Sequence, residues 1–184
     1  MSTEIVEFKA EDGIKLDGVL NKCDNNTSNI LIQIHGMTSN CFKSRDKIIA
    51  KKAKEIGIDT LCFNNRGSEV VRYIKNETTT LLAGMAYEKV EDSYYDIVGA
   101  IEFATDMGYE NIFLQGHSLG STKVVYTYNR LKDENNPILN NIKGVILLSL
   151  VDIPGVVGLG INDDYIKLAK EKQKRRRTYG FDAI

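Results

Sequence analysis

The chain has 184 residues, of which 42% are hydrophobic and 27% are charged, with 24 basic against 25 acidic side chains and a net charge of −1. This length and apolar content suit one domain with a hydrophobic core, and they disfavour intrinsic disorder. A near-neutral chain gives no electrostatic reason to expect nucleic acid or an anionic membrane as the main partner.

The cysteines and the N-terminal segment indicate the cellular compartment in which the protein is expected. The chain has three cysteines, an odd number, at positions Cys23, Cys41 and Cys62, and no two are spaced as CxxC. This disfavours both a disulfide scaffold and a structural zinc site. Residues 1–9 are polar and acidic rather than a signal peptide, and no apolar run approaches the roughly 20 residues that span a bilayer. We therefore expect a cytoplasmic protein with reduced thiols, no membrane span and no metal.

The hydrophobic pattern predicts strands that alternate with helices. The predicted strands are 4–8, 14–20, 30–34, 58–63, 111–115 and 143–151. The predicted helices are 45–56, 90–105, a segment from the 116–120 motif to about 131, and 163–177. Residues 68–87 have no clean period and are predicted to form a long loop. The order predicts an α/β fold, with an N-terminal β-hairpin at Asp12-Gly13, then a mostly parallel sheet with helices on both faces.

The strongest motif is Gly116-His117-Ser118-Leu119-Gly120, between a predicted strand and a predicted helix. A sharp strand-to-helix turn brings the residues two before and two after the serine close to it, so side chains there would clash. Such a turn lifts the serine hydroxyl above the sheet edge in a strained conformation. The alternatives are a plain Gly-rich turn and a phosphate-binding loop, and the spacing of the following lysine does not fit the second.

A second motif, beginning His35-Gly36-Met37, directly follows the strand at 30–34. An oxyanion hole needs two backbone donors from different chain segments. Met37 can supply one N–H, and Leu119, next after Ser118, can supply the other. His35 taken alone is better read as a structural histidine at a strand end.

Three segments, in this order, resemble the α/β-hydrolase superfamily in its esterase and lipase-like branch. They are the His35-Gly36 loop, the 63–67 loop (with Asn64 where the family usually has Asp) and the Gly116–Gly120 turn. The resemblance covers about residues 4–155. It implies a small-molecule ester or related acyl substrate, Ser118 as the nucleophile, Met37 and Leu119 as the oxyanion hole, and no cofactor.

The chain departs from this family in its catalytic base, which follows the serine in family order. The only histidines are His35 and His117, and neither follows Ser118. Asp152, after the last predicted strand, is a weak candidate for the triad acid, and a loop residue or helix cap is the alternative. Loss of the base costs on the order of a millionfold in turnover, so we expect this chain alone to be inactive or very weak.

The strand at 144–151 is apolar at nearly every position, but only a polar, basic segment follows it. The sequence therefore predicts an exposed hydrophobic edge, in a single domain (1–184) that lacks the C-terminal strands of the fold. A partner chain or an oligomer would cover this edge, and residues 156–184 would be a lid or tail. Two other readings stay open: a non-catalytic binding or assembly module, and a truncated remnant.

Overall fold

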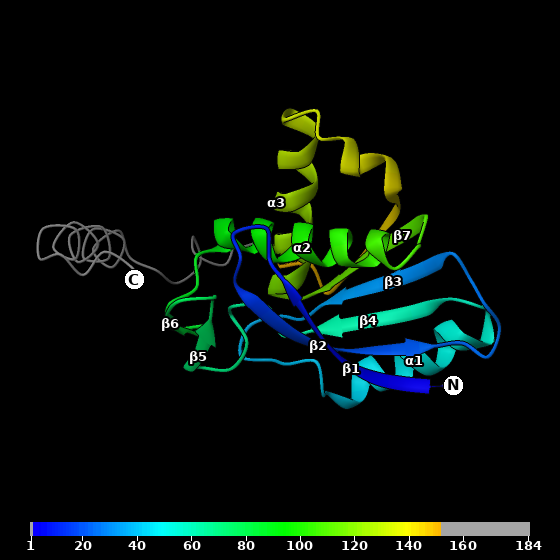
Figure 1. Cartoon of the computed structure of the whole chain (residues 1–184), viewed down its shortest axis with the longest axis horizontal. Coiled ribbons are helices and arrows are strands. Elements are labelled where there is room, and N and C mark those ends of the chain that lie inside the picture. The colour runs from blue at the N-terminus through cyan, green and yellow to red at the C-terminus, as the bar shows by residue number, and fades with distance from the viewer. Residues whose placement is uncertain (1, 152–184) are drawn as a thin grey trace, which may run out of the picture. The chain divides into compact units, whose positions relative to one another are not determined.

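The computed structural model describes residues 2–151, in which six strands form one sheet in the order β1-β2-β4-β3-β7-β8 (Figure 1). The strands of this sheet are β1 (Ser2–Lys9), β2 (Lys15–Lys22), β3 (Asn29–Ile34), β4 (Asp59–Phe63), β7 (Asn111–His117) and β8 (Ile142–Leu148). The helices are α1 (Ser44–Glu55), α2 (Ser93–Asp106) and α3 (Leu119–Asp133), with short 3-10 turns η1 (Val90–Asp92) and η2 (Pro137–Asn141).

The first two strands form the predicted hairpin. β1 and β2 pair antiparallel, with Phe8 opposite Leu16, and Gly13 supplies the positive φ of +83° that the turn requires. β2 also pairs antiparallel with β4, so the hairpin extends one side of the sheet. The prediction of an N-terminal hairpin joined to a mostly parallel sheet is confirmed.

The rest of the sheet is parallel: β3 pairs with β4 on one side and with β7 on the other, and β7 pairs with β8. Figure 1 shows α2 and α3 on one face of the sheet and α1 on the opposite face. The carboxyl ends of β4, β3, β7 and β8 therefore meet at one edge, which is where ligands usually bind in parallel α/β sheets.

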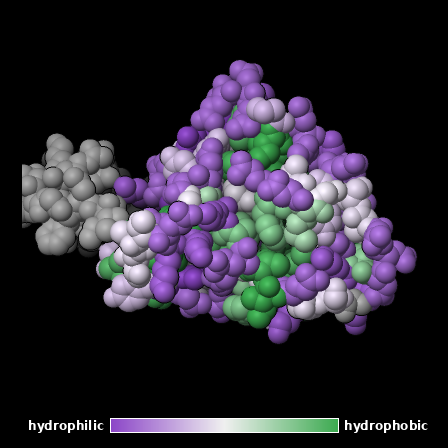
Figure 2. All heavy atoms as spheres, in the orientation of Figure 1, coloured by the Kyte–Doolittle hydropathy of each residue, from purple (hydrophilic) through white to green (hydrophobic). Residues whose placement is uncertain are grey.

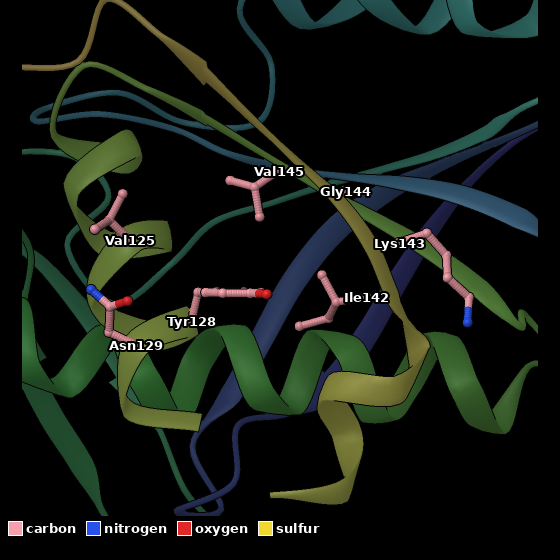
Figure 3. Close-up of a pocket in the computed structure, with 7 residues that line it drawn as sticks. All are labelled: Val125, Tyr128, Asn129, Ile142, Lys143, Gly144 and Val145. Atoms are coloured by element: carbon pink, nitrogen blue, oxygen red, sulfur yellow. The ribbon is translucent and has the colours of Figure 1, made fainter. Parts of the chain in front are cut away.

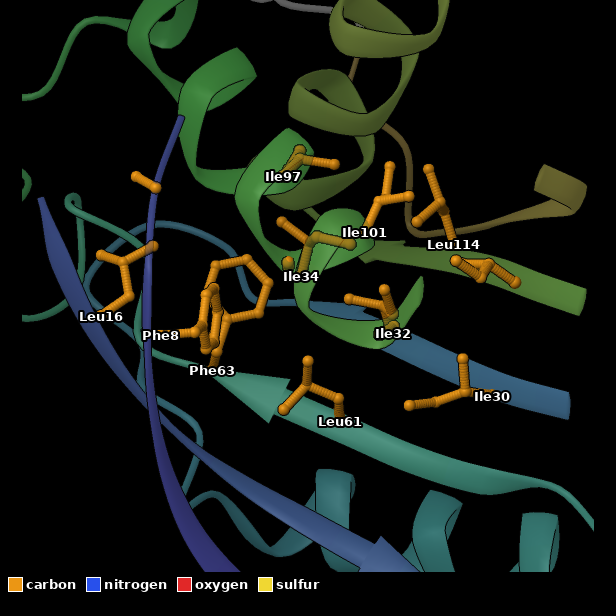
Figure 4. Close-up of a cluster of buried hydrophobic side chains, with 14 of the residues drawn as sticks. Phe8, Leu16, Ile30, Ile32, Ile34, Leu61, Phe63, Ile97, Ile101 and Leu114 are labelled. Atoms are coloured by element: carbon orange, nitrogen blue, oxygen red, sulfur yellow. The ribbon is translucent and has the colours of Figure 1, made fainter. Parts of the chain in front are cut away.

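The hydrophobic core lies between the sheet and helix α2 (Figure 4). Ile30, Ile32 and Ile34 point to this side from β3, and Ile97 and Ile101 meet them from α2. Because β3 is covered on both faces, its whole apolar run is buried, as the continuous pattern predicts. Figure 2 shows that the surface in the same view is mostly hydrophilic, with hydrophobic patches between.

Two predicted segments differ from the structure. The predicted loop at 68–87 contains a small antiparallel pair, β5 (Arg72–Lys75) and β6 (Thr80–Ala83). The turn between them is closed by the Asn76 side chain, which accepts backbone hydrogen bonds from Thr78 and Thr79. β8 ends at Leu148 rather than 151, because Ser149 adopts a φ of +52°. The predicted lid or tail at 156–184 and the predicted helix at 163–177 lie outside the described residues.

Candidate active site

Ser118 forms the junction between β7 and α3, with φ 53° and ψ −126°. The glycines around it are sterically required. A Cβ on Gly116 would lie 2.4 Å from the Ser121 Cα, and one on Gly120 would lie 2.3 Å from the Ile34 carbonyl oxygen. Ser118 is therefore held in a sparsely populated backbone conformation by the close packing of its neighbours.

Backbone strain is concentrated along the carboxyl edge of the sheet. Thr38, Glu69, Ser118 and Ser149 all have φ between 52° and 63°, and they follow β3, β4, β7 and β8 respectively. Threonine is β-branched, so Thr38 is especially unfavourable in this region. Strained residues cluster at active sites and ligand clamps, and here they mark the edge that carries Ser118.

The loop after β3 packs directly against the Ser118 turn. A Cβ on Gly36 would lie 2.8 Å from the His117 carbonyl oxygen, 3.0 Å from the Ser118 Cβ and 3.4 Å from the Leu119 nitrogen. Only glycine permits this approach. The two motifs predicted to act together are thus brought into contact, although more than 80 residues separate them in the chain.

Met37 and Leu119 each offer a backbone N–H at this junction. Leu119 is the first residue of α3 and has no earlier helical carbonyl to bond. Within residues 2–151, neither N–H donates a hydrogen bond. Two unsatisfied donors from different segments therefore lie close to Ser118.

A cavity of about 270 Å³ opens beside Ser118. Its lining comes from the loop after β3, the start of α1 and the end of β7: Gly36, Met37, Thr38, Ser39, Lys43, Arg45, His117 and Ser118. Ser118 and His117 line the same cavity, but no hydrogen bond joins their side chains in the described part of the chain.

The two histidines are held neutral. His35 is fully buried, its Nδ1 donates to the Gly36 carbonyl at 2.9 Å, and burial lowers its pKa to about 3. The pKa of His117 is also lowered, first by partial burial and then by the charge of Arg45. His35 is therefore placed as a buried histidine whose ring bonds to its own loop, in line with the sequence-based reading of His35 alone as a structural histidine at a strand end.

A buried ion pair beneath the Ser118 turn was not predicted from the sequence. Lys123, on α3, is 0% exposed and is paired with Glu88. Its ammonium also donates to the Asn65 Oδ1 at 3.2 Å, and the Asn65 Nδ2 donates to the His35 carbonyl at 3.4 Å. Lys123 lies one turn before Thr127 on the buried face of α3.

The loop after β4 is fixed by polar contacts. Asn64 accepts a hydrogen bond from the Cys41 N–H at 2.9 Å and donates to Asp17 at 2.5 Å. Arg66 is mostly buried and pairs with Asp96 at 2.8 Å, and its N–H donates to the same carboxylate at 2.7 Å. The residues resembling the family loop therefore support the sheet edge, and none of them lines the Ser118 cavity.

A second, larger cavity of about 390 Å³ lies between α3 and β8 (Figure 3). It is lined by Val125, Tyr128, Asn129, Ile142, Lys143, Gly144 and Val145. No carboxylate, histidine or serine lines it, so it carries no acyl-transfer chemistry. It flanks β8, which pairs only with β7 within the described range and leaves Ile146 44% exposed. The predicted hydrophobic edge is present among these residues.

The remaining sequence predictions concern the cysteine thiols, metal binding, a membrane span and Asp152. Cys41 is buried and burial raises its pKa to about 12, which fits an inert thiol. Among the residues from 2 to 151, no group of three or more His, Cys, Asp or Glu side chains is arranged to hold a metal ion, and no helix is long and apolar enough to cross a membrane. Asp152, the candidate acid, lies outside the described residues.

Comparison with known proteins supports the fold. No protein-family model and no curated protein matches the chain. Among solved structures, it is similar to Est1E from Butyrivibrio proteoclasticus with ferulic acid bound, at 23% identity and a TM-score of 0.65, covering 85% of this chain and 58% of that one. It is similar to the α/β hydrolase GrgF from Penicillium sp. sh18, at 17% identity and a TM-score of 0.68, covering 97% and 56%.

The esterase Pf2001 from Pyrococcus furiosus is a further match, at 21% identity and a TM-score of 0.56, covering 71% of this chain and 48% of that one. These matches show that the chain has the α/β-hydrolase fold. The chain spans about half of the length of the structures it matches.

Proposed function

We propose that this chain carries the nucleophile and the oxyanion hole of a serine hydrolase that cleaves small-molecule esters or related acyl bonds. Ser118 is the nucleophile. The backbone N–H groups of Met37 and Leu119 stabilise the oxyanion. The supporting motif consists of His35, Gly36, Gly116, His117 and Gly120, which shape the two turns.

The observation that carries this proposal is the contact between the two turns. Gly36 lies against Ser118 and Leu119, and the two N–H groups on either side of that contact are unsatisfied among the described residues. Two backbone donors from different segments, neither used within the described part of the chain, stand beside a strained serine, which is the arrangement that holds an anionic oxygen. The N-terminus of α3 adds the positive end of its dipole at the same place.

In the proposed reaction, the Ser118 Oγ attacks the carbonyl carbon of the ester while a base accepts its proton. The carbonyl oxygen becomes an oxyanion held by the Met37 and Leu119 N–H groups. The C–O bond to the leaving group then breaks, the alkoxide takes the proton from the base, and an acyl ester on Ser118 remains. Water, deprotonated by the same base, hydrolyses this ester and regenerates Ser118.

The base is the part that these residues do not supply. His35 is buried with a pKa of about 3, and among residues 2–151 the His117 side chain makes no hydrogen bond to the Ser118 hydroxyl. We therefore place the base outside residues 1–184. A second copy of the same chain would bring only the same two histidines, so the source is a different polypeptide segment.

The structure favours the β8 edge as the place where that segment docks. The Ser118 N–H donates to the Leu148 carbonyl at 2.9 Å, so the carboxyl end of β8 lies directly beside the serine. A strand added parallel to β8 would end at the same edge and would present the residues that follow it to Ser118. Asp152 follows β8 in sequence and remains a candidate acid for that base.

The ester substrate is supported by the matched structures, which include an esterase and a protein solved with ferulic acid. The fold alone does not choose the reaction, because an epoxide hydrolase from Vigna radiata is also among the matches.

The proposal is tested by covalent labelling of the purified chain with a fluorophosphonate, with and without added imidazole as an external base. We expect slow labelling at Ser118, faster with imidazole, and none in Ser118→Ala. Ser149→Ala is the matched control, since Ser149 also follows a parallel strand at positive φ but does not line the cavity. Labelling that persists in Ser118→Ala, or is absent throughout, contradicts the proposal.

The exposed β8 edge also favours a second candidate function, that of a non-catalytic assembly module on the hydrolase scaffold. In that case Ser118→Ala leaves binding of a strand-donating partner unchanged, and no labelling of Ser118 occurs under any condition.

A further inference from the structure

The cavity beside Ser118 has an unusual electrostatic lining. Besides Ser118 and the oxyanion loop, the lining residues include Lys43 and Arg45, whose side chains are cationic, and no Asp or Glu. His117 completes the wall and is neutral near pH 7, because burial and the charge of Arg45 lower its pKa. The formal charge facing the cavity is therefore positive.

The Lys43 ammonium is available to a ligand. Lys43 is exposed, and its side chain makes no hydrogen bond or ion pair with any other residue from 2 to 151. It immediately precedes α1, a helix of 12 residues without a side-chain cap at its N-terminus. The first N–H groups of that helix add a positive partial charge on the same side of the cavity.

Arg45 is oriented by a buried carboxylate behind it. The Asp46 side chain is 2% exposed, and its Oδ1 accepts from the Arg45 Nε at 3.0 Å and Nη2 at 2.8 Å. The Arg45 Nη1 makes no hydrogen bond within the described part of the chain, so donors remain for a ligand. Asp46 is not part of the cavity wall. The pair therefore presents a fixed guanidinium to the cavity rather than a carboxylate.

We infer that the preferred substrates are small esters that also bear a carboxylate, such as monoesters of short dicarboxylic acids, with the carboxylate held by Lys43 and Arg45. This inference rests on the proposed function, since it places the ester group at Ser118. The cavity volume of about 270 Å³ lies just below the usual range for small-molecule sites, which favours a short substrate. A guanidinium and an ammonium together recognise a carboxylate through charge-assisted hydrogen bonds.

Binding is measured separately from hydrolysis, so that the two proposals can fail independently. The probes are monomethyl succinate and its neutral counterpart dimethyl succinate. Each is titrated into the unmodified chain, enriched in nitrogen-15, while the amide NMR signals of Gly36, Thr38 and Ser39 are followed. We expect these signals to shift with monomethyl succinate and at least about fivefold weaker binding of dimethyl succinate. Added salt should weaken the first and leave the second unchanged.

Lys43→Glu is the primary variant, because Lys43 is exposed and its replacement should not disturb folding. We expect it to abolish the preference for the monoester. Lys47→Glu is the matched control, since it makes the same charge reversal at an exposed lysine of α1 that does not line the cavity. Arg45→Gln should weaken the binding of the monoester further. The amide spectrum of this variant reports whether the chain still folds when Asp46 is left without its partner.

Equal binding of the two esters, equal behaviour of Lys43→Glu and Lys47→Glu, or no binding of either ester would overturn the inference. Binding that depends on Lys43 together with no labelling of Ser118 would leave an anion site without the hydrolase. Labelling of Ser118 with no preference for the monoester would leave the hydrolase and remove the anion site.

Discussion

β7 and β8 are neighbouring parallel strands of seven residues, and each is rich in apolar side chains, but their surroundings differ. β7 lies between β3 and β8, and Ile112 and Leu114 are fully buried. β8 pairs only with β7 in the described structure, and Val145, Ile146 and Leu147 are 37–44% exposed. The comparison shows that an apolar strand pattern predicts a need for burial without identifying the segment that meets it.

The opposite edge of the sheet is protected differently. β1 carries charged side chains along its length, and Glu4 and Glu7 form ion pairs with Lys22 and Lys15 of β2. Charged edge strands resist pairing with other chains. β8 has a single charged residue, Lys143, so of the two edges of the described six-stranded sheet the β8 edge is the one suited to accept another strand.

The largest effect on stability is expected at the buried ion pair between Lys123 and Glu88, near the Ser118 turn. Lys123→Ala leaves Glu88 as an uncompensated buried charge and should lower the free energy of unfolding by about 3–5 kcal/mol. Urea unfolding measures this loss. Lys132→Ala, an exposed lysine on the same helix, is the control and should change stability by less than about 0.5 kcal/mol.

A double variant separates charge from packing at the same place. Lys123→Met with Glu88→Leu removes both charges, and we expect it to recover most of the stability lost in Lys123→Ala. If the double variant is as unstable as the single one, the hydrogen bonds to Asn65 rather than the ion pair hold this region together.

The comparison of the two strands is tested directly by a matched pair of truncations. Leu114→Ala removes a fully buried side chain and should cost about 2–5 kcal/mol. Leu147→Ala, on the neighbouring strand and 37% exposed, should cost about 1 kcal/mol or less. Urea unfolding of both variants gives the difference, and equal costs would show that β8 is enclosed in solution.

The sequence predicted the elements whose pattern is local and continuous. The apolar runs at 30–34 and 111–115, with the glycines of the 116–120 turn, were sufficient to place Ser118 at a strand-to-helix junction. β5 and β6 were missed, because strands of four residues give too short a pattern to show a period. Lys123 was missed because its partner, Glu88, lies in a loop 35 residues away, and only tertiary packing brings the two together.

A smaller effect is expected from pH. Burial lowers the pKa of His35 in the folded state to about 3, below its ordinary value of 6.5, so the unfolded chain binds its proton first as the pH falls. The contribution of His35 to stability is complete above pH 6.5 and is lost as the pH falls towards 3. Between pH 7 and pH 5 the free energy of unfolding should drop by about 2 kcal/mol.

Urea unfolding at pH 7, 6 and 5 tests this expectation, with His35→Gln as the comparison. Carboxylates contribute mainly below this window, so the difference in slope between the two proteins isolates His35. A wild-type slope as flat as that of His35→Gln would mean that His35 is not buried as a neutral ring.

The smallest effect on stability, and the most informative for the open strand, is expected from Ile146→Lys. Ile146 is 44% exposed on β8, so a lysine there can reach solvent, and the free energy of unfolding should change by less than about 0.5 kcal/mol. Its effect should instead appear in association, because a charge on an edge strand opposes pairing with another strand. Sedimentation velocity at increasing concentration should show growth in mass for the wild-type chain and little growth for Ile146→Lys.

Ile5→Lys, at an 82% exposed position on β1, should behave as wild type, since the charges already on β1 prevent pairing there. If both lysine variants reduce association equally, the two edges do not differ, and the case for docking a base-carrying strand specifically at β8 is lost.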